Sequence, residues 1–96
     1  MTFISIANEI GIDISSRARG AELRAKVEQQ IRAGNKVVLD FVGVRTISDS
    51  FADELFGVLL EDYSDIWFRE NVEVRNIAQF PRKTILGAIE QRKLVA

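Results

Sequence analysis

The sequence has 96 residues, a length that suits one domain, and 47% of them are hydrophobic, enough for a packed core and too many for a disordered chain. Thirteen basic and fourteen acidic side chains leave a net charge of −1, so no basic excess exists to neutralise phosphates, and we expect no nucleic-acid partner. Histidine and cysteine are absent, which excludes disulfides, a Ser-His-Asp triad and the commonest zinc ligands, and we expect a protein that is not an enzyme and uses no cofactor.

The N-terminal stretch MTFISIANEIG has neither the basic start nor the A-x-A cleavage pattern of a signal peptide. No apolar run in the chain reaches about 18 residues, the length that a membrane-spanning helix needs. We therefore expect a cytoplasmic protein without a membrane partner.

Phe3 to Ala7 predicts a short strand because apolar and β-branched residues predominate there. Residues 8–14 (NEIGIDI) fit either a second short strand or an extended loop.

A first helix is predicted to begin after Ser15 or Ser16, residue types that cap helix N-termini, and to run to about Ala33. Its apolar stripe, with a spacing of four residues, consists of Leu23, Val27 and Ile31. Gly34 and Asn35 follow, and both residue types adopt the left-handed backbone that ends many helices.

The central stretch VVLDFVGVRTISDSFADELFGVLL contains the strongest strand signal, Lys36 to Phe41, with three consecutive apolar residues that suit a strand covered on both faces. Val42 to Ser48 is predicted to be a connecting loop. A second helix is predicted to start near Ser50, with Ser48 or Asp49 as its cap, and to fade near Tyr63. Asp53 and Glu54 lie in its first turns, where the helix dipole favours acidic groups.

The remaining segment SDIWFREN is predicted to be a loop or a short helical turn, and Val72 to Ile77 alternates in polarity and predicts a third strand. Pro81 suits the first position of a last helix, which is expected to turn Ile85, Ile89 and Leu86 inward.

Residues 36–77 thus read as strand, loop, helix and strand, an order that calls for two parallel strands joined by a crossover. We expect a single α/β domain, residues 1–96, with a small mixed or parallel sheet of three to four strands and about three helices. The loops that leave the carboxyl ends of such strands commonly carry function. The segment GVRTISDS lies in such a loop.

This central stretch resembles the STAS domain, which is found in anti-sigma-factor antagonists and at the cytoplasmic end of sulfate transporters. In STAS domains a strand ending in Asp leads to a Gly-Val pair, then to Asp-Ser-Ser-Gly and an apolar helix. Here LDFVGV matches the first part, and ISDSF stands where Ile-Asp-Ser-Ser-Gly would be. Ser48 then takes the acidic position and Asp49 that of the phosphorylated residue, while Phe51 replaces the glycine.

The phrase SFADELF is still closer to a small bacterial STAS-like family of unknown function, whose members look like LDF-x-G-V-x-x-I-S-x-S-F-A-D-E-L. The flanking segments SSRARGAELR and VRNI are similar to that family's Arg-containing segment and to its Asn after the last strand. The resemblance extends over roughly the last five-sixths of the chain.

The resemblance implies partner switching, in which the domain docks on a histidine-kinase-like ATPase or on a regulator. Phosphorylation of the loop would add about −1.5 to −2 charges and change that docking. Asp49 cannot be modified as a serine can, so it is either a permanent mimic of the modified state or a helix cap, and Ser48 and Ser50 remain as acceptors. The implied docking surface is the loop and first helical turn, residues 46–54.

Each candidate residue also has a simpler structural interpretation. Ser48, Asp49 and Ser50 form a docking loop or only cap the helix. Arg17 and Arg19 either are solvated or pin a carboxylate such as Asp49, or a partner's phosphate. Three further alternatives remain open, namely an Mg²⁺ or aspartyl-phosphate site at Asp40, Asp49 and Asp53, hydrogen bonds that Asp40 accepts from loop N–H groups, and Trp67 with Phe68 as an interface or a local cover.

The lead hypothesis is a regulatory or accessory domain that acts by protein docking. One alternative is a small nucleotide- or phosphate-binding domain, since helix N-termini attract anions. Another is a purely structural subunit of a homodimer or larger homo-oligomer, which would relieve the marginal stability of a domain this small.

Overall fold

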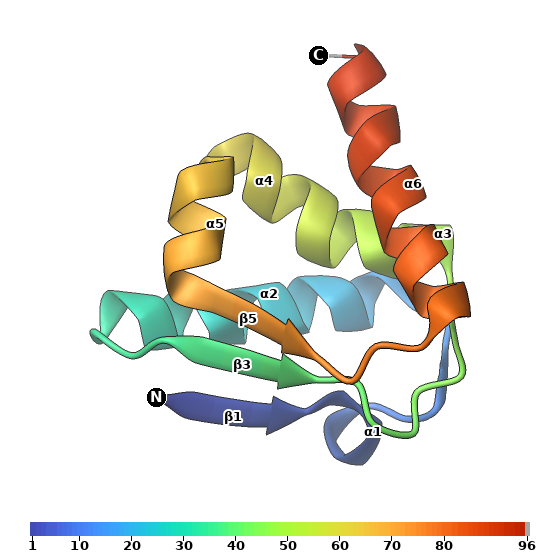
Figure 1. The fold of residues 1–96 in the computed structure, drawn as a ribbon, viewed down its shortest axis with the longest axis horizontal. Coiled ribbons are helices and arrows are strands. Elements are labelled where there is room, and N and C mark those ends of the chain that lie inside the picture. Colours follow the sequence, from blue (N-terminus) through green and yellow to red (C-terminus); the bar gives the residue numbers. More distant parts are fainter. Residues whose placement is uncertain (96) are drawn as a thin grey trace.

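Within the residues that it describes, 1–95, the computed structural model contains five strands in two parallel sheets (Figure 1). The larger sheet has the order β1-β3-β5, and the smaller pairs β2 with β4. The strands are β1 (Thr2–Ser5), β2 (Asp13–Ile14), β3 (Val37–Asp40), β4 (Thr46–Ile47) and β5 (Val72–Arg75). The α/β class and the parallel pairing of the two strands on either side of the central helix are therefore confirmed. Of residues 8–14, only Asp13 and Ile14 form a strand, whereas Asn8 and Glu9 are helical.

Three parts of the strand prediction differ from the structure, and one of them is β5, which ends at Arg75 rather than at Ile77. The first strand ends at Ser5 rather than Ala7, because the Ser5 hydroxyl accepts a hydrogen bond from the Asn8 N–H at 3.3 Å and caps a helical turn. The predicted loop 42–48 contains β4, a two-residue strand that forms only by pairing with β2. This small sheet lies beyond the carboxyl ends of the larger one and leads the chain into the central helix.

The helices are α1 (Ile6–Glu9), α2 (Arg17–Arg32), α3 (Asp49–Ala52), α4 (Val58–Asp62), α5 (Asp65–Asn71) and α6 (Gln79–Val95), with a π-helical turn, η1 (Asp53–Gly57), between α3 and α4. Local signals account for the ends of α2. The Ser16 hydroxyl accepts a hydrogen bond from the Arg19 N–H at 3.1 Å, and Gly34, with φ of 89°, follows the last turn. None of the described helices is both long and apolar enough to cross a bilayer.

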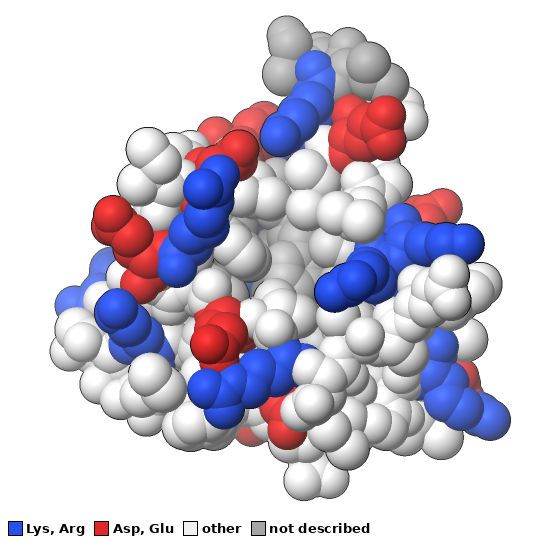
Figure 2. Space-filling view, viewed as in Figure 1, with Lys and Arg blue, Asp and Glu red and all other residues white. Residues whose placement is uncertain are grey.

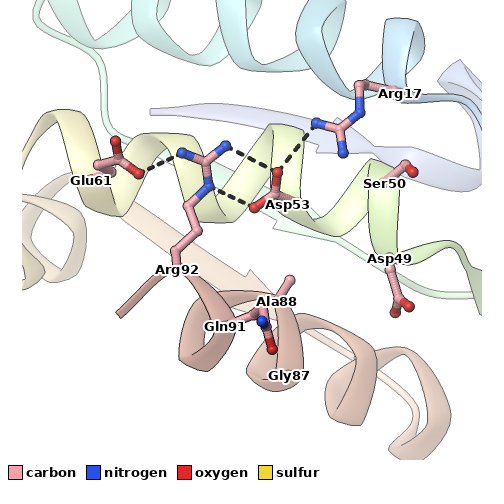
Figure 3. A pocket seen from close by; sticks show the side chains of 9 residues that line it. All are labelled: Arg17, Asp49, Ser50, Asp53, Glu61, Gly87, Ala88, Gln91 and Arg92. Atoms are coloured by element: carbon pink, nitrogen blue, oxygen red, sulfur yellow. Dashed lines mark hydrogen bonds and ion pairs between the residues drawn. The ribbon is translucent and has the colours of Figure 1, made fainter. Parts of the chain in front are cut away.

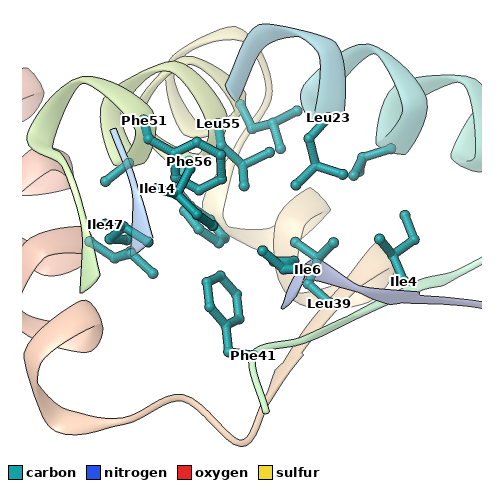
Figure 4. Packing of buried hydrophobic residues seen from close by; sticks show 14 of the residues in the cluster. Ile4, Ile6, Ile14, Leu23, Leu39, Phe41, Ile47, Phe51, Leu55 and Phe56 are labelled. Carbon is teal, nitrogen blue, oxygen red and sulfur yellow. The ribbon is translucent and has the colours of Figure 1, made fainter. Parts of the chain in front are cut away.

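The hydrophobic core lies between one face of the larger sheet and the helical layer made by α2 and the α3-η1-α4 run (Figure 4). Leu23 and Val27 of the predicted stripe are buried there, and Ile31 is half-buried. The rings of Phe41 and Phe56 stack across the layers with centroids 6.2 Å apart. This layer fixes the direction of the central helical run relative to the strands.

Residues 64–71 form helix α5, capped by the Ser64 hydroxyl, which accepts a hydrogen bond from the Trp67 N–H at 3.0 Å. The Trp67 ring stacks on Tyr63 with centroids 3.9 Å apart, and the Phe68 ring lies 6.0 Å from Phe56. Both predicted interface aromatics are half-buried against the core, which bears out their role as a local cover. An interface role for them stays a prediction.

The last helix begins at Gln79, so Pro81 occupies its third position rather than its first. Ile85 is buried and Ile89 half-buried, as predicted. The prediction for Leu86 is wrong, because 58% of its side chain is exposed. The stripe that packs on the α3-η1 run is instead made by Ile85, Ala88 and Arg92.

Gly20 and Gly87 test how closely the helices pack. A Cβ at Gly20 would lie 3.0 Å from the Phe51 carbonyl oxygen and 3.2 Å from the Glu54 Cβ, whereas a Cβ at Gly87 meets nothing within 4 Å. We expect Gly20→Ala to lower the free energy of unfolding by about 1–3 kcal/mol through overpacking. The matched control Gly87→Ala should raise it by about 0.5–1 kcal/mol through helix propensity. Urea denaturation measures both, and equal effects would contradict this account of the α2-α3 contact.

Candidate functional site

The connection from β3 to the central helix is held by side-chain hydrogen bonds at its start. One oxygen of Asp40, Oδ1, accepts from the Val42 N–H at 3.0 Å and from the Asn76 amide at 3.1 Å. These bonds, the one from Asn76 foremost, hold the pKa of Asp40 below its ordinary value. The expectation that Asp40 bonds the loop backbone is therefore confirmed, and its carboxylate ties the ends of β3 and β5 together.

Ser48 caps the helix, as its residue type predicts. Its hydroxyl accepts a hydrogen bond from the Phe51 N–H at 3.0 Å, and its own N–H donates to the Ile14 carbonyl at 2.7 Å. The next two side chains are not used in this way. Within the described part of the chain, neither the exposed Asp49 carboxylate nor the half-buried Ser50 hydroxyl takes part in a hydrogen bond or ion pair. Both therefore remain available to another molecule.

Asp49 and Ser50 line an open pocket of about 660 Å³ between the α3-η1 run and α6 (Figure 3). Its complete lining consists of Arg17, Asp49, Ser50, Asp53, Glu61, Gly87, Ala88, Gln91 and Arg92. The predicted loop and the start of the first long helix thus meet at one site, the docking pocket. Its other wall is α6, which contains none of the predicted site residues.

Asp53 and Arg92 each take part in three side-chain hydrogen bonds in the docking pocket. The Asp53 carboxylate receives the Arg92 guanidinium through two bonds, Nε to Oδ1 at 2.6 Å and NH2 to Oδ2 at 3.0 Å. Arg17 reaches Oδ2 from the other side at 3.2 Å, and Arg92 also bonds Glu61 (Figure 3). Chiefly because of the Arg92 bonds, and with help from Arg17, the pKa of Asp53 lies below its ordinary value of 3.8 despite partial burial.

The alternative in which Arg17 pins a carboxylate is confirmed, but the carboxylate is Asp53 rather than Asp49. Arg17 extends toward the next turn of the helix, where its guanidinium contacts Asp53 and also Glu54 at 3.4 Å. Arg19 instead bonds Glu22 and the Glu9 carbonyl oxygen. Asp49 and Asp53 lie one turn apart on the central helix. Arg17 bonds Asp53, which is the carboxylate that lies nearer to α2.

Glu54 belongs to the helix packing rather than to the docking pocket. Its carboxylate accepts a 2.7 Å bond from Arg24 of α2, and this bond is the main reason that the pKa of Glu54 lies below its ordinary value. Arg24 also donates to the Glu54 carbonyl oxygen. Such a bond is compatible with the π-helical turn, since backbone carbonyls in a π-turn depart from the α-helical pattern.

Gly57 makes the Asp53–Arg92 contact sterically possible. A Cβ at this position would lie 2.6 Å from Asp53 Oδ1 and 3.0 Å from Arg92 Nε. The absence of a side chain therefore lets the guanidinium lie flat against the π-turn. Sequence reasoning missed both Gly57 and Arg92, which is 39 residues from Asp53, and no local pattern links such distant positions.

The carboxylates of Asp40, Asp49 and Asp53 do not form a metal centre. Among the residues with a described position, no three Asp or Glu side chains come together in a way that could hold an ion. Asp40 Oδ1 and both oxygens of Asp53 already accept hydrogen bonds from protein donors. The Mg²⁺ alternative, which needs these three carboxylates together, therefore gains no support from the described residues.

One comparison with known proteins identifies a relationship. The family profile described as STAS-like domain of unknown function (DUF4325) matches residues 19–79, which is more than half of the chain. Almost all of α6 lies beyond the matched segment. No significant match exists to a curated protein or to a solved structure.

The Asp53–Arg92 contact should stabilise the fold in a pH-dependent way. Because the pKa of Asp53 is lowered by folding, the contact stabilises fully above the ordinary value of 3.8 and is lost as the pH falls through the folded value. We expect Arg92→Met to cost about 1–3 kcal/mol at pH 7 and clearly less at pH 3.

Urea denaturation of the wild type and the variant at both pH values measures this difference. The control is Lys83→Met, which removes an exposed cation with no ion pair among the described residues and should change stability by under about 0.5 kcal/mol at either pH. A penalty for Arg92→Met that stays constant down to pH 3 would show that packing, not charge, provides the contact's stability.

Proposed function

The chain belongs to this STAS-like family, and we propose that it is a non-enzymatic regulatory or accessory domain that binds a protein partner through residues 46–54. The observation that carries the proposal is the uncommitted pair at the mouth of the docking pocket, Asp49 and Ser50. Every other ionisable group in that pocket is already bonded within the protein. A free carboxylate beside a free hydroxyl, on a rigid helix start, offers a directed polar contact.

The charge of the docking pocket indicates which partner it suits. Three acidic side chains line it against two arginines, so its formal charge is 2 − 3 = −1. The arginines are neutralised by Asp53 and Glu61, which leaves the charge of Asp49 exposed. We therefore propose that the partner contributes a lysine or arginine side chain to the pocket, where it would pair with Asp49.

Partner switching is the finer part of the proposal and rests on the resemblance to STAS domains. Of the two loop serines, Ser50 is the better acceptor for a phosphoryl group, because the Ser48 hydroxyl is occupied as a helix cap. A phosphate on Ser50 would add about −1.5 to −2 charges beside Asp49. It would strengthen attraction to a basic partner, and a histidine-kinase-like ATPase is the partner class that the resemblance implies.

Asp49→Arg tests the docking surface. The substitution reverses the charge at an exposed position and should leave the fold intact, while it places two cations face to face in the complex. We expect at least about a tenfold loss of affinity, that is about 1.4 kcal/mol, for a partner that binds the pocket. Quantitative affinity capture, with the tagged protein as bait, compares each captured protein between variants.

The matched control is Asp62→Arg, an equal change of charge at another exposed aspartate, outside the pocket. A docking partner should be retained by the wild type and Asp62→Arg and lost with Asp49→Arg. If every captured protein behaves alike with the two variants, residues 46–54 are not the docking surface.

The nucleotide-binding alternative would require the same pocket to attract phosphate groups. A negative lining repels phosphates, and both arginines are already paired, so the observed charges do not favour it. We expect no binding heat in calorimetry with ATP or GTP, with or without Mg²⁺. Saturable heat that Arg17→Met abolishes would overturn the docking proposal in favour of nucleotide binding.

A further inference from the structure

A second concave surface lies on the side of α6 that faces away from the docking pocket. Two adjoining hollows of about 200 and 210 Å³ share Ile89 and run along the helix as one apolar groove. Figure 2 shows the hollow near the middle of this face, between the α5–β5 corner and α6. The groove is lined by Phe56, Gly57, Leu60, Glu61, Phe68, Val74, Ile77, Arg82, Ile85, Leu86, Ile89, Arg92 and Lys93.

The groove wall formed by α6 consists of residues at regular helical spacing. Arg82, Leu86, Ile89 and Lys93 follow one another at spacings of four, three and four residues, so they lie along one face of the helix. Leu86 is 58% exposed, whereas the preceding residue, Ile85, is buried. The predicted inward position of Leu86 fails because α6 packs on the α3-η1 run through the adjacent stripe, and this stripe is left open.

Apart from Glu61, the charged side chains that line the groove are positive. Arg82 forms no ion pair with any described residue, and Lys93 has only a 3.7 Å contact with Asp65. The single acidic residue in the lining, Glu61, is bonded to Arg92. An apolar floor with an unpaired cation at one end and a weakly paired one at the other complements an apolar segment that carries acidic residues.

We propose that this apolar groove binds an amphipathic helix of a partner protein, with its apolar stripe on Leu86 and Ile89 and an acidic side chain against Arg82. From Arg82 to Lys93 the groove extends over 11 helical steps, about 16 Å, which suits about three turns of helix. Helices that dock in this way present apolar residues every three or four positions. The groove shares Glu61 and Arg92 with the docking pocket, but its formal charge is positive rather than negative.

Two synthetic helical peptides of about 14 residues test the proposal. Both carry the same leucine stripe at i, i+3, i+4 and i+7, and one has glutamates and the other lysines at the flanking positions. Titration into ¹⁵N-labelled protein should show the acidic peptide binding at least about tenfold more tightly. The shifted amide signals should belong to the groove, with Val74, Ile77 and Leu86 among them. Absence of binding at millimolar peptide, or shifts centred elsewhere, would overturn the proposal.

Three variants separate the groove from general charge effects. Leu86→Glu should abolish binding of the acidic peptide, and Arg82→Glu should weaken it about tenfold. Lys83→Glu makes the same change of charge at the neighbouring exposed position, which does not line the groove, and should leave the affinity within about twofold. Circular dichroism confirms that each variant is folded. Equal losses of affinity for Arg82→Glu and Lys83→Glu would show that long-range charge alone explains the effect. That result would overturn the assigned contact between the peptide and Arg82.

A second copy of the chain is the competing occupant. Analytical ultracentrifugation of the protein alone should show a monomer, because two groove faces with cationic ends repel each other. A dimer that Leu86→Glu dissociates would assign the groove to self-association and overturn the proposal of an acidic partner helix. Asp49→Arg, on the other side of α6, should not affect peptide binding, so failure of one proposal leaves the other standing.

Discussion

The carboxylate of Asp53 joins three separate parts of the chain, and the position of α6 depends on it. Arg92 of α6 bonds both of its oxygens, while Arg17 of α2 bonds one from the opposite side. The group is only partly exposed, at 22%, so solvent screens these bonds less than it would at the surface. Gly57 leaves the space in which the arginine lies. This junction therefore determines where α6 stands relative to the central helix.

Once α6 is held there, it separates two concave surfaces of different chemistry. On one side, the docking pocket is lined by five charged side chains and carries one excess negative charge. On the other side, the groove is mostly apolar and its uncommitted charges are positive. A single helix achieves this because its side chains at successive positions point in different directions, so Ala88 lines the docking pocket and Ile89 lines the groove. We therefore propose that the two surfaces suit different partners.

The elements that the sequence predicts well are those with local causes. Ser16, Ser48 and Gly34 mark helix ends through their own backbone bonds or dihedral angles, and the order of strands and helices implies parallel pairing. The misses have distant causes. Strand β4 exists only because β2 lies beside it, the π-turn inserts an extra residue without a compositional signal, and the partner of Asp53 lies 39 residues away. Helical spacing alone also allows Leu86 to face inward, and only the packing of Ile85 decides against it.

The shared wall determines which residues can separate the two roles. Arg92 lines both the docking pocket and the groove and also holds α6 in place, so its loss would change both surfaces together. Asp49 and Leu86 each line only one of them. Ligands on the two sides would act on the same helix and could therefore influence each other's binding, and thermodynamic linkage requires any such coupling to be reciprocal.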